Sequence, residues 1–149
     1  MSPVITESKL EQLAGFLEKL QKFENLSYEE FEDDKHFIVE RLLELLVIYA
    51  NDILLNFFAR INEDMPTTLK TTFLRAGELQ ILPADLAKSL GDAAAMRNVL
   101  VHAYTDVDLK IVYDSIGEAL RDFSRFVEIM SQKVNLIHPQ ITDPPPPEE

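Results

Sequence analysis

The segment RNVLVHAY, residues 97–104, sets an arginine, an asparagine, a histidine and a tyrosine among aliphatic residues. Cleavage of RNA without a metal needs a base for the ribose 2′-hydroxyl, an acid for the leaving oxygen and a cation for the developing phosphorane charge. His102 can serve as the acid or the base, and Arg97 can hold a phosphate through two hydrogen bonds. Because one chain offers only one such histidine, a symmetric dimer would complete the set.

Helix geometry limits how these side chains can meet. Asn98 and His102 are four residues apart and share a helix face, whereas Arg97 and His102 are five apart and offset by roughly 140°. Arg97 and His102 therefore converge only if the helix ends near the histidine or if a second chain contributes. Ordinary structural roles are also open: Arg97 can pair with an acid, His102 can cap a helix C-terminus and Tyr104 can pack its ring.

Outside this segment the sequence contains few groups arranged for chemistry. The chain has no cysteine, which excludes disulfides, a thiolate nucleophile and cysteine-based metal sites. The three histidines, His36, His102 and His138, are scattered without metal-ligand spacing. The acidic run at residues 29–34 lacks the glycine and the alternating ligands of a calcium loop. A P-loop, GxGxxG and GxSxG are all missing from the sequence, so we expect no metal site and no cofactor.

The charge of the chain disfavours broad binding to nucleic acid or to an anionic membrane. Twenty-six acidic and 14 basic residues give a net charge of −12. Residues 1–64 carry six basic and fourteen acidic side chains, and residues 111–149 carry three and seven. Residues 65–110 carry five of each sign. An anion is therefore expected to bind in this neutral stretch, which contains the motif.

Hydrophobic periodicity predicts helices in the first half of the chain. Leucines at steps of three and four residues, Leu10 to Leu20, predict an amphipathic helix that runs to about residue 23. Ser27 and Glu30 fit a capping box, which we expect to open a short turn. From about residue 34 to 61 the sequence predicts a long helix that is apolar on most of its circumference. Such a helix is either central to a bundle or shared between two chains.

The second half of the chain is predicted to form three more helices. The first is short and ends near Gly77. Pro83 fits the first position of the next helix, which carries the motif. Asp106 or Asp108 can cap the last helix, whose apolar stripe extends to Met130. Because no stretch alternates with period two, the predicted fold class is an all-α bundle of about five helices.

One domain is expected from the length of the chain. We assign residues 1–135 to a single helical domain and residues 136–149 to a proline-rich, acidic tail that is disordered. The N-terminus lacks the basic and apolar regions of a secretory signal. The longest apolar run, residues 45–50, is far shorter than the about 20 residues of a membrane span. A soluble, cytoplasmic protein without membrane attachment is therefore expected.

The motif and its surroundings resemble a known family. MRNVLVHAY, followed by TDVDLKIVYDSIGEALRDF and preceded by LPADLAKSLGDAAA and NDILLNFFARI, is similar to the HepT-like toxins of the HEPN superfamily, whose signature is R-x4-H-x-Y. The resemblance covers roughly residues 33–130. It implies an all-α, symmetric homodimer in which the two motifs face each other across a cleft and act as a metal-independent endoribonuclease. Arg97 and His102 match the catalytic pair, and Asn98 matches the polar residue beside the arginine.

The resemblance also implies a partner. Such toxins belong to a two-gene, type VII-like toxin–antitoxin system whose antitoxin is a minimal nucleotidyltransferase, MntA. That partner adenylylates the tyrosine that matches Tyr104, and the added AMP places bulk and negative charge beside an anion site. The RNA substrate, tRNA or mRNA, is left open, although the acidic flanks favour a selective site. Asp52 is a candidate to support the cleft, with simple solvation as the alternative.

Two other functions remain possible from the sequence. A non-catalytic helical module that binds nucleotides and assists a nucleotidyltransferase would use Arg97 for a phosphate and His102 for a base or ribose. A structural dimerisation bundle would explain the apolar long helix but would leave the motif unexplained. An assay for RNA cleavage separates the first of these from the nuclease.

Overall fold

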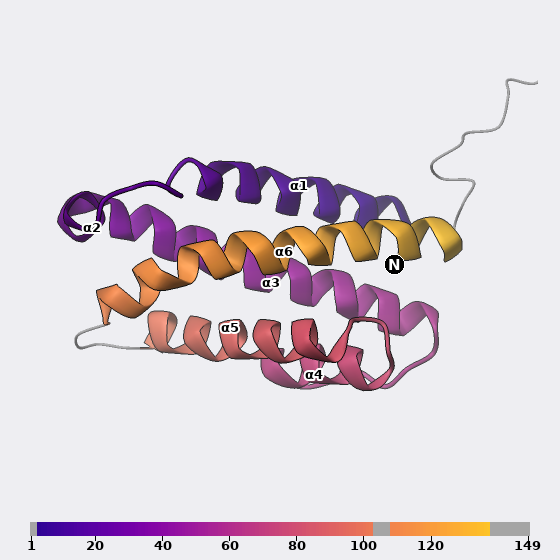
Figure 1. Cartoon of the computed structure of the whole chain (residues 1–149). Helices are drawn as coiled ribbons and strands as arrows, with labels where there is room; N and C mark the ends of the chain where they lie inside the picture. The colour runs from indigo at the N-terminus through magenta and orange to yellow at the C-terminus, as the bar shows by residue number, and fades with distance from the viewer. Residues whose placement is uncertain (1–2, 103–107, 138–149) are drawn as a thin grey trace, which may run out of the picture.

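The computed structural model describes the backbone of residues 3–102 and 108–137, and the side chains of residues 6–97 and 108–134 (Figure 1). Over these residues the chain forms helices joined by short loops, without a strand, which confirms the predicted all-α class. The elements are α1 (Pro3–Gln21), α2 (Tyr28–Glu30), the π-helical turn η1 (Phe31–Lys35), α3 (His36–Arg60), α4 (Leu69–Glu78), α5 (Ala84–His102) and α6 (Leu109–Ile137).

The long helix α3 is the centre of the bundle. It packs against α1, α4, α5 and α6; in Figure 1, α1 lies on one side of it, α4 and α5 lie on the other, and α6 crosses it. By length and composition alone, the continuous helix Tyr28–Arg60 could span a membrane. However, 56% of its most apolar window is buried inside the bundle. Its hydrophobicity is therefore explained by contact with four neighbouring helices, as expected for a central core helix.

The start of this long helix differs from the prediction. Ser27 accepts a hydrogen bond from the Glu30 backbone N–H at 3.2 Å. The helix begins directly after Ser27, whereas a separate short turn was predicted there. The π turn η1 continues it, because the His36 N–H donates to the Phe31 carbonyl five residues back. Phe31 is fully buried and packs against Tyr113 with ring centroids 5.3 Å apart. Burial of this ring explains why the segment stays helical.

The short helix ends where it was predicted to, and the structure adds a role for Gly77. α4 continues through Gly77 and ends at Glu78, and Gln80 beyond it adopts the left-handed conformation with φ 61°. A Cβ at Gly77 would lie 2.6 Å from the Cβ of Ala87, so glycine is needed for close packing of α4 on α5. Pro83 directly precedes α5 and accepts a hydrogen bond from the Ala87 N–H at 2.9 Å, one position before the predicted place.

Of the two residues predicted to cap the last helix, Asp106 and Asp108, the structure shows Asp108 in that role. The Asp108 carboxylate accepts from the backbone N–H groups of Lys110 at 3.1 Å and Ile111 at 3.4 Å, so Asp108 caps α6. The predicted apolar stripe faces the core, with Phe123 and Met130 buried. α6 is described as far as Ile137, two residues beyond the predicted domain boundary. The rest of the proline-rich tail, residues 138–149, lies outside the described residues.

Candidate functional site

The motif occupies the last turns of α5. Arg97, Asn98 and His102 all lie on this helix, which is described as far as His102. Convergence of Arg97 and His102 stays a prediction. The side chains of Asn98 and His102, and the whole of Tyr104, lie outside the described residues. On the helical backbone Asn98 and His102 share a face, as their spacing of four residues predicts.

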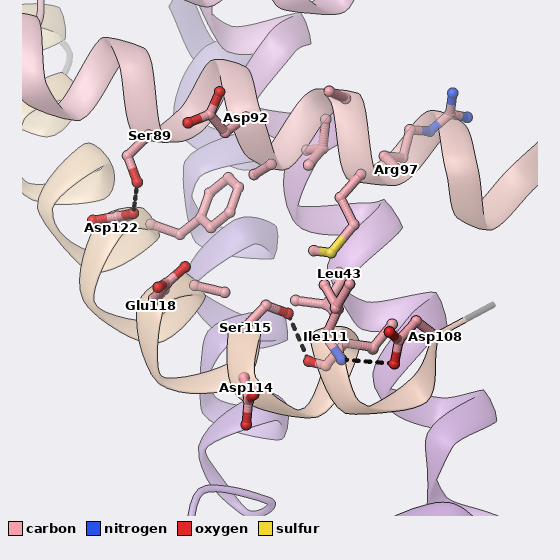
Figure 2. A pocket seen from close by; sticks show the side chains of 17 residues that line it. Leu43, Ser89, Asp92, Arg97, Asp108, Ile111, Asp114, Ser115, Glu118 and Asp122 are labelled. Atoms are coloured by element: carbon pink, nitrogen blue, oxygen red, sulfur yellow. Dashed lines mark hydrogen bonds between the residues drawn. The ribbon is translucent and has the colours of Figure 1, made fainter.

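A groove of ≈ 590 Å³ runs between α3, α5 and α6 and ends at Arg97 (Figure 2). Helix α3 forms the floor with Leu43 and Val47. Apolar side chains of the two other helices form much of the walls: Ala93, Ala95, Met96, Ile111, Val112, Ala119 and Phe123. A hydrogen bond between Ser89 and Asp122 lies at the end of the groove opposite Arg97 (Figure 2).

Among the four polar residues of the motif, the structure describes the side chain of Arg97. Its stem lines the groove, and Figure 2 shows its guanidinium extending away from the carboxylates of α6. The Nε atom is buried and has no hydrogen-bond partner among the described side chains. A buried guanidinium N–H without a partner is costly and needs an explanation. Its fork of donors matches the oxygens of a phosphate or carboxylate, so Arg97 is suited to bind an anion.

The groove itself is acidic. Five carboxylates line it, and Arg97 is the only basic lining residue in the described part of the chain; the carboxylates belong to Asp92, Asp108, Asp114, Glu118 and Asp122. Lys110 pairs with Asp114 at 3.0 Å, but both groups are exposed, so this pair offsets little of the charge. A polyanion is therefore repelled along the groove and can approach only at its Arg97 end.

This acidic lining was missed by the sequence analysis. Residues 65–110 are neutral as a stretch, but α6 brings three further carboxylates, those of Asp114, Glu118 and Asp122, beside the motif helix. The three lie on one face of α6 at steps of four residues, and the last of them, Asp122, is buried. This spacing was the available signal, and it could be used only once α6 was known to lie against α5.

The other candidate residues lie away from the groove. Asp52 pairs with Lys9 on α1 at 3.2 Å and does not line the groove, and its suggested support of the cleft between two motifs stays a prediction. His36 Nδ1 lies 3.0 Å from the Glu40 carboxylate. The Tyr113 hydroxyl donates to the Leu26 carbonyl. In the described parts of the chain no group of three His, Asp or Glu side chains could hold a metal ion.

Comparison with known proteins relates both sequence and fold to one family. The sequence model of the family described as Ribonuclease HepT-like matches residues 13–130. The tRNA nuclease HepT of Aphanizomenon flos-aquae (strain 2012/KM1/D3) is 34% identical over 129 residues, which cover 85% of this chain and 88% of that protein.

Solved structures agree at the level of the fold. The tri-AMPylated Shewanella oneidensis HEPN toxin in complex with MNT antitoxin superposes with a TM-score of 0.78 at 19% identity, covering 89% of this chain and 99% of that one. A toxin–antitoxin complex with AMP-PNP gives a TM-score of 0.77 at 18% identity, covering 86% and 98%. These values show a shared helical architecture.

Proposed function

The chain belongs to the HepT-like ribonuclease family, and on this premise we propose that it is the toxin of a toxin–antitoxin pair, a metal-independent endoribonuclease of the cytoplasm. The observation that carries the proposal is Arg97, which lines the groove and whose buried Nε lacks a partner among the described side chains. Its position on α5, five residues before His102, reproduces the spacing of the catalytic pair.

The proposed reaction divides the work between the motif residues. The ribose 2′-oxygen attacks the phosphorus as the bond to the 5′-oxygen breaks. One His102 takes the 2′-proton and a second protonates the leaving oxygen. Arg97 stabilises the charge on the phosphorane, and Asn98 hydrogen-bonds to the substrate beside His102. Two histidines are required, so the active species is a symmetric homodimer whose motifs face a shared cleft.

The charge of the groove bears on the choice of substrate. Five lining carboxylates repel the RNA backbone except at the Arg97 end, so few phosphates can be held at once. Such a site favours a structured RNA that presents one accessible strand over general degradation. The relative named a tRNA nuclease supports tRNA over mRNA as the substrate class.

Cleavage of RNA by the purified chain tests this function. Total RNA incubated with and without EDTA should be cut equally, at few positions. Arg97→Ala and His102→Ala should each reduce cleavage about a hundredfold or more, since each removes charge stabilisation or proton transfer. His36→Ala is the matched control, because His36 pairs with Glu40 outside the groove. Full activity of His102→Ala would contradict the mechanism. RNA that is bound but not cut would instead support the non-catalytic nucleotide-binding module.

The regulation we propose acts on Tyr104. A nucleotidyltransferase antitoxin of the MntA type would transfer AMP from ATP, forming a bond between the tyrosine oxygen and the α-phosphorus and releasing pyrophosphate. The added phosphate would repel RNA beside Arg97. Tyr104 matches the modified tyrosine of the motif, and a solved relative of this fold is described as tri-AMPylated. Tyr113 is a poorer acceptor, because its hydroxyl already donates to the Leu26 carbonyl.

Mass spectrometry after co-expression with a nucleotidyltransferase of the MntA type tests the modification. One or more AMP groups should map to Tyr104, and Tyr104→Phe should stay unmodified and toxic. Tyr113→Phe is the control and should be modified as the wild type is. Modification of Tyr113, or neutralisation of Tyr104→Phe, would mean that the antitoxin blocks the cleft without this chemistry.

A further inference from the structure

Polar contacts join α5 to α6 at only one end of the groove, as far as side chains are described. The Asp85 carboxylate lies 3.3 Å from Arg125 Nη1, and one turn later the Ser89 hydroxyl donates to the Asp122 carboxylate (Figure 2). Beyond Ser89 the groove separates the two helices as far as Arg97. The described polar contact with α6 that is nearest to Arg97 therefore lies eight residues, about 12 Å, upstream of it.

Asp122 carries the one carboxylate among the buried polar side chains that the structure describes. Its residue is 7% exposed, and the other buried polar side chains in the described residues are neutral. A buried carboxylate is costly unless it is hydrogen-bonded. Its partners are the Ser89 hydroxyl and, more distantly, Arg121 Nε at 3.6 Å. A leucine could fill this space without that cost, so what the carboxylate adds is a directional bond to one position of α5.

Ser89 and Arg97 lie on the same side of α5. Ser89, Ala93, Met96 and Arg97 follow at steps of four, three and one residues, and all four line the groove. A rotation of α5 that moves Ser89 therefore moves Arg97 through the same angle. Because side chains reach about 6 Å from a helix axis, a rotation of about 10° displaces their tips by about 1 Å. A misplacement of about 1 Å in an active site can cost about a hundredfold in rate.

We propose that Ser89 and Asp122 are positioning residues for the reaction: their hydrogen bond sets the rotation of α5 on α6 and so the direction of the Arg97 guanidinium. The inference rests on the function proposed above for Arg97. Neither residue contacts RNA; both act through Arg97.

Single-turnover cleavage of RNA by the full-length chain tests the inference. Ser89→Ala should lower the maximal rate about tenfold or more while the RNA concentration for half-maximal rate changes less than about twofold. Ser89→Thr keeps the hydroxyl and should restore the rate. Ser115→Ala is the matched control, because Ser115 lines the same groove but donates to the Val112 carbonyl within α6. Thermal unfolding of each variant establishes that it is folded at the assay temperature.

A second comparison separates positioning from general destabilisation. In the Arg97→Ala background, Ser89→Ala should cause a smaller loss of rate than in the wild type, because the part of its effect that passes through Arg97 is already absent. An unchanged rate for Ser89→Ala, or an equal loss in the Arg97→Ala background, would overturn the positioning role and leave the function of Arg97 intact. A fully active Arg97→Ala would instead overturn the proposed function, and the inference with it.

Discussion

Replacing Gly77 by alanine is expected to destabilise the protein, although alanine is the better helix former. Within α4 the substitution should gain about 1 kcal/mol from helix propensity. The new Cβ, however, would lie 2.6 Å from the Cβ of Ala87, against an optimal carbon–carbon separation of about 3.5–4.0 Å. Ala87 is 2% exposed and has no flexible atoms to move aside. α4 and α5 must therefore separate by about 1 Å.

Overpacking of this kind costs about 1–3 kcal/mol, which exceeds or cancels the gain in propensity. The net loss in the free energy of unfolding should be about 1 kcal/mol, or about 2–4 °C in the midpoint of thermal unfolding. Gly117→Ala in α6 is the control, since a Cβ there meets nothing within 4 Å. That variant should gain about 0.5–1 kcal/mol, so one substitution has opposite signs at two helical glycines.

Urea unfolding followed by circular dichroism measures both free energies. Adding Ala87→Gly to Gly77→Ala removes the clash, so the double variant should be more stable than the sum of the two single losses predicts. If Gly77→Ala stabilises the chain as much as Gly117→Ala does, the close approach of α4 and α5 is not what requires glycine.

The remaining predictions concern assembly, a buried polar cluster and acid stability. Light scattering at micromolar concentration should give twice the chain mass of 17.0 kDa, and a monomer would contradict the composite site. Thr6→Val should cost about 1–3 kcal/mol in urea unfolding, because the Thr6 hydroxyl accepts hydrogen bonds from Asn56 and Arg60; Thr6→Ser should retain most of the stability. A hydrogen bond from Arg125 lowers the pKa of Asp85, so this pair contributes stability above the ordinary carboxyl pKa and loses it as the pH falls through the lowered one. Arg125→Gln should therefore reduce stability at neutral pH and leave it unchanged in strong acid.

Local patterns were sufficient to predict most of the helices. Leu10, Leu13, Leu17 and Leu20 recur at helical spacing, and all four are buried in the bundle. Asp108 was predicted as a possible cap because a short acidic side chain preceded an apolar stripe, and it accepts two backbone hydrogen bonds. Both signals depend only on residues within one or two turns, which is why the sequence contained them.

Features that depend on packing between helices were not predictable. Gly77 was expected near a helix end, and α4 does end one residue later, but the need for glycine at this position follows from the close approach of α5. The same limit applies to the site. The spacing of Arg97 and His102 identified the motif, whereas the bond between Ser89 and Asp122 joins residues 33 apart in sequence. The acidic lining of the groove likewise requires α6 to lie beside α5.

The π turn η1 has a consequence for the length of the chain. Its five residues span the distance that four would span in an α-helix, because the Phe31 carbonyl bonds to the N–H of His36. Phe31 is thereby brought into line with Val39, and both are fully buried. In an unbroken α-helix a separation of eight residues would turn them about 80° apart, whereas seven would align them. The long helix therefore corresponds to a regular α-helix that has accepted one inserted residue. A chain shortened by one exposed residue between positions 32 and 34 would keep the same core, so this turn is where relatives can differ in length by one without a change of fold.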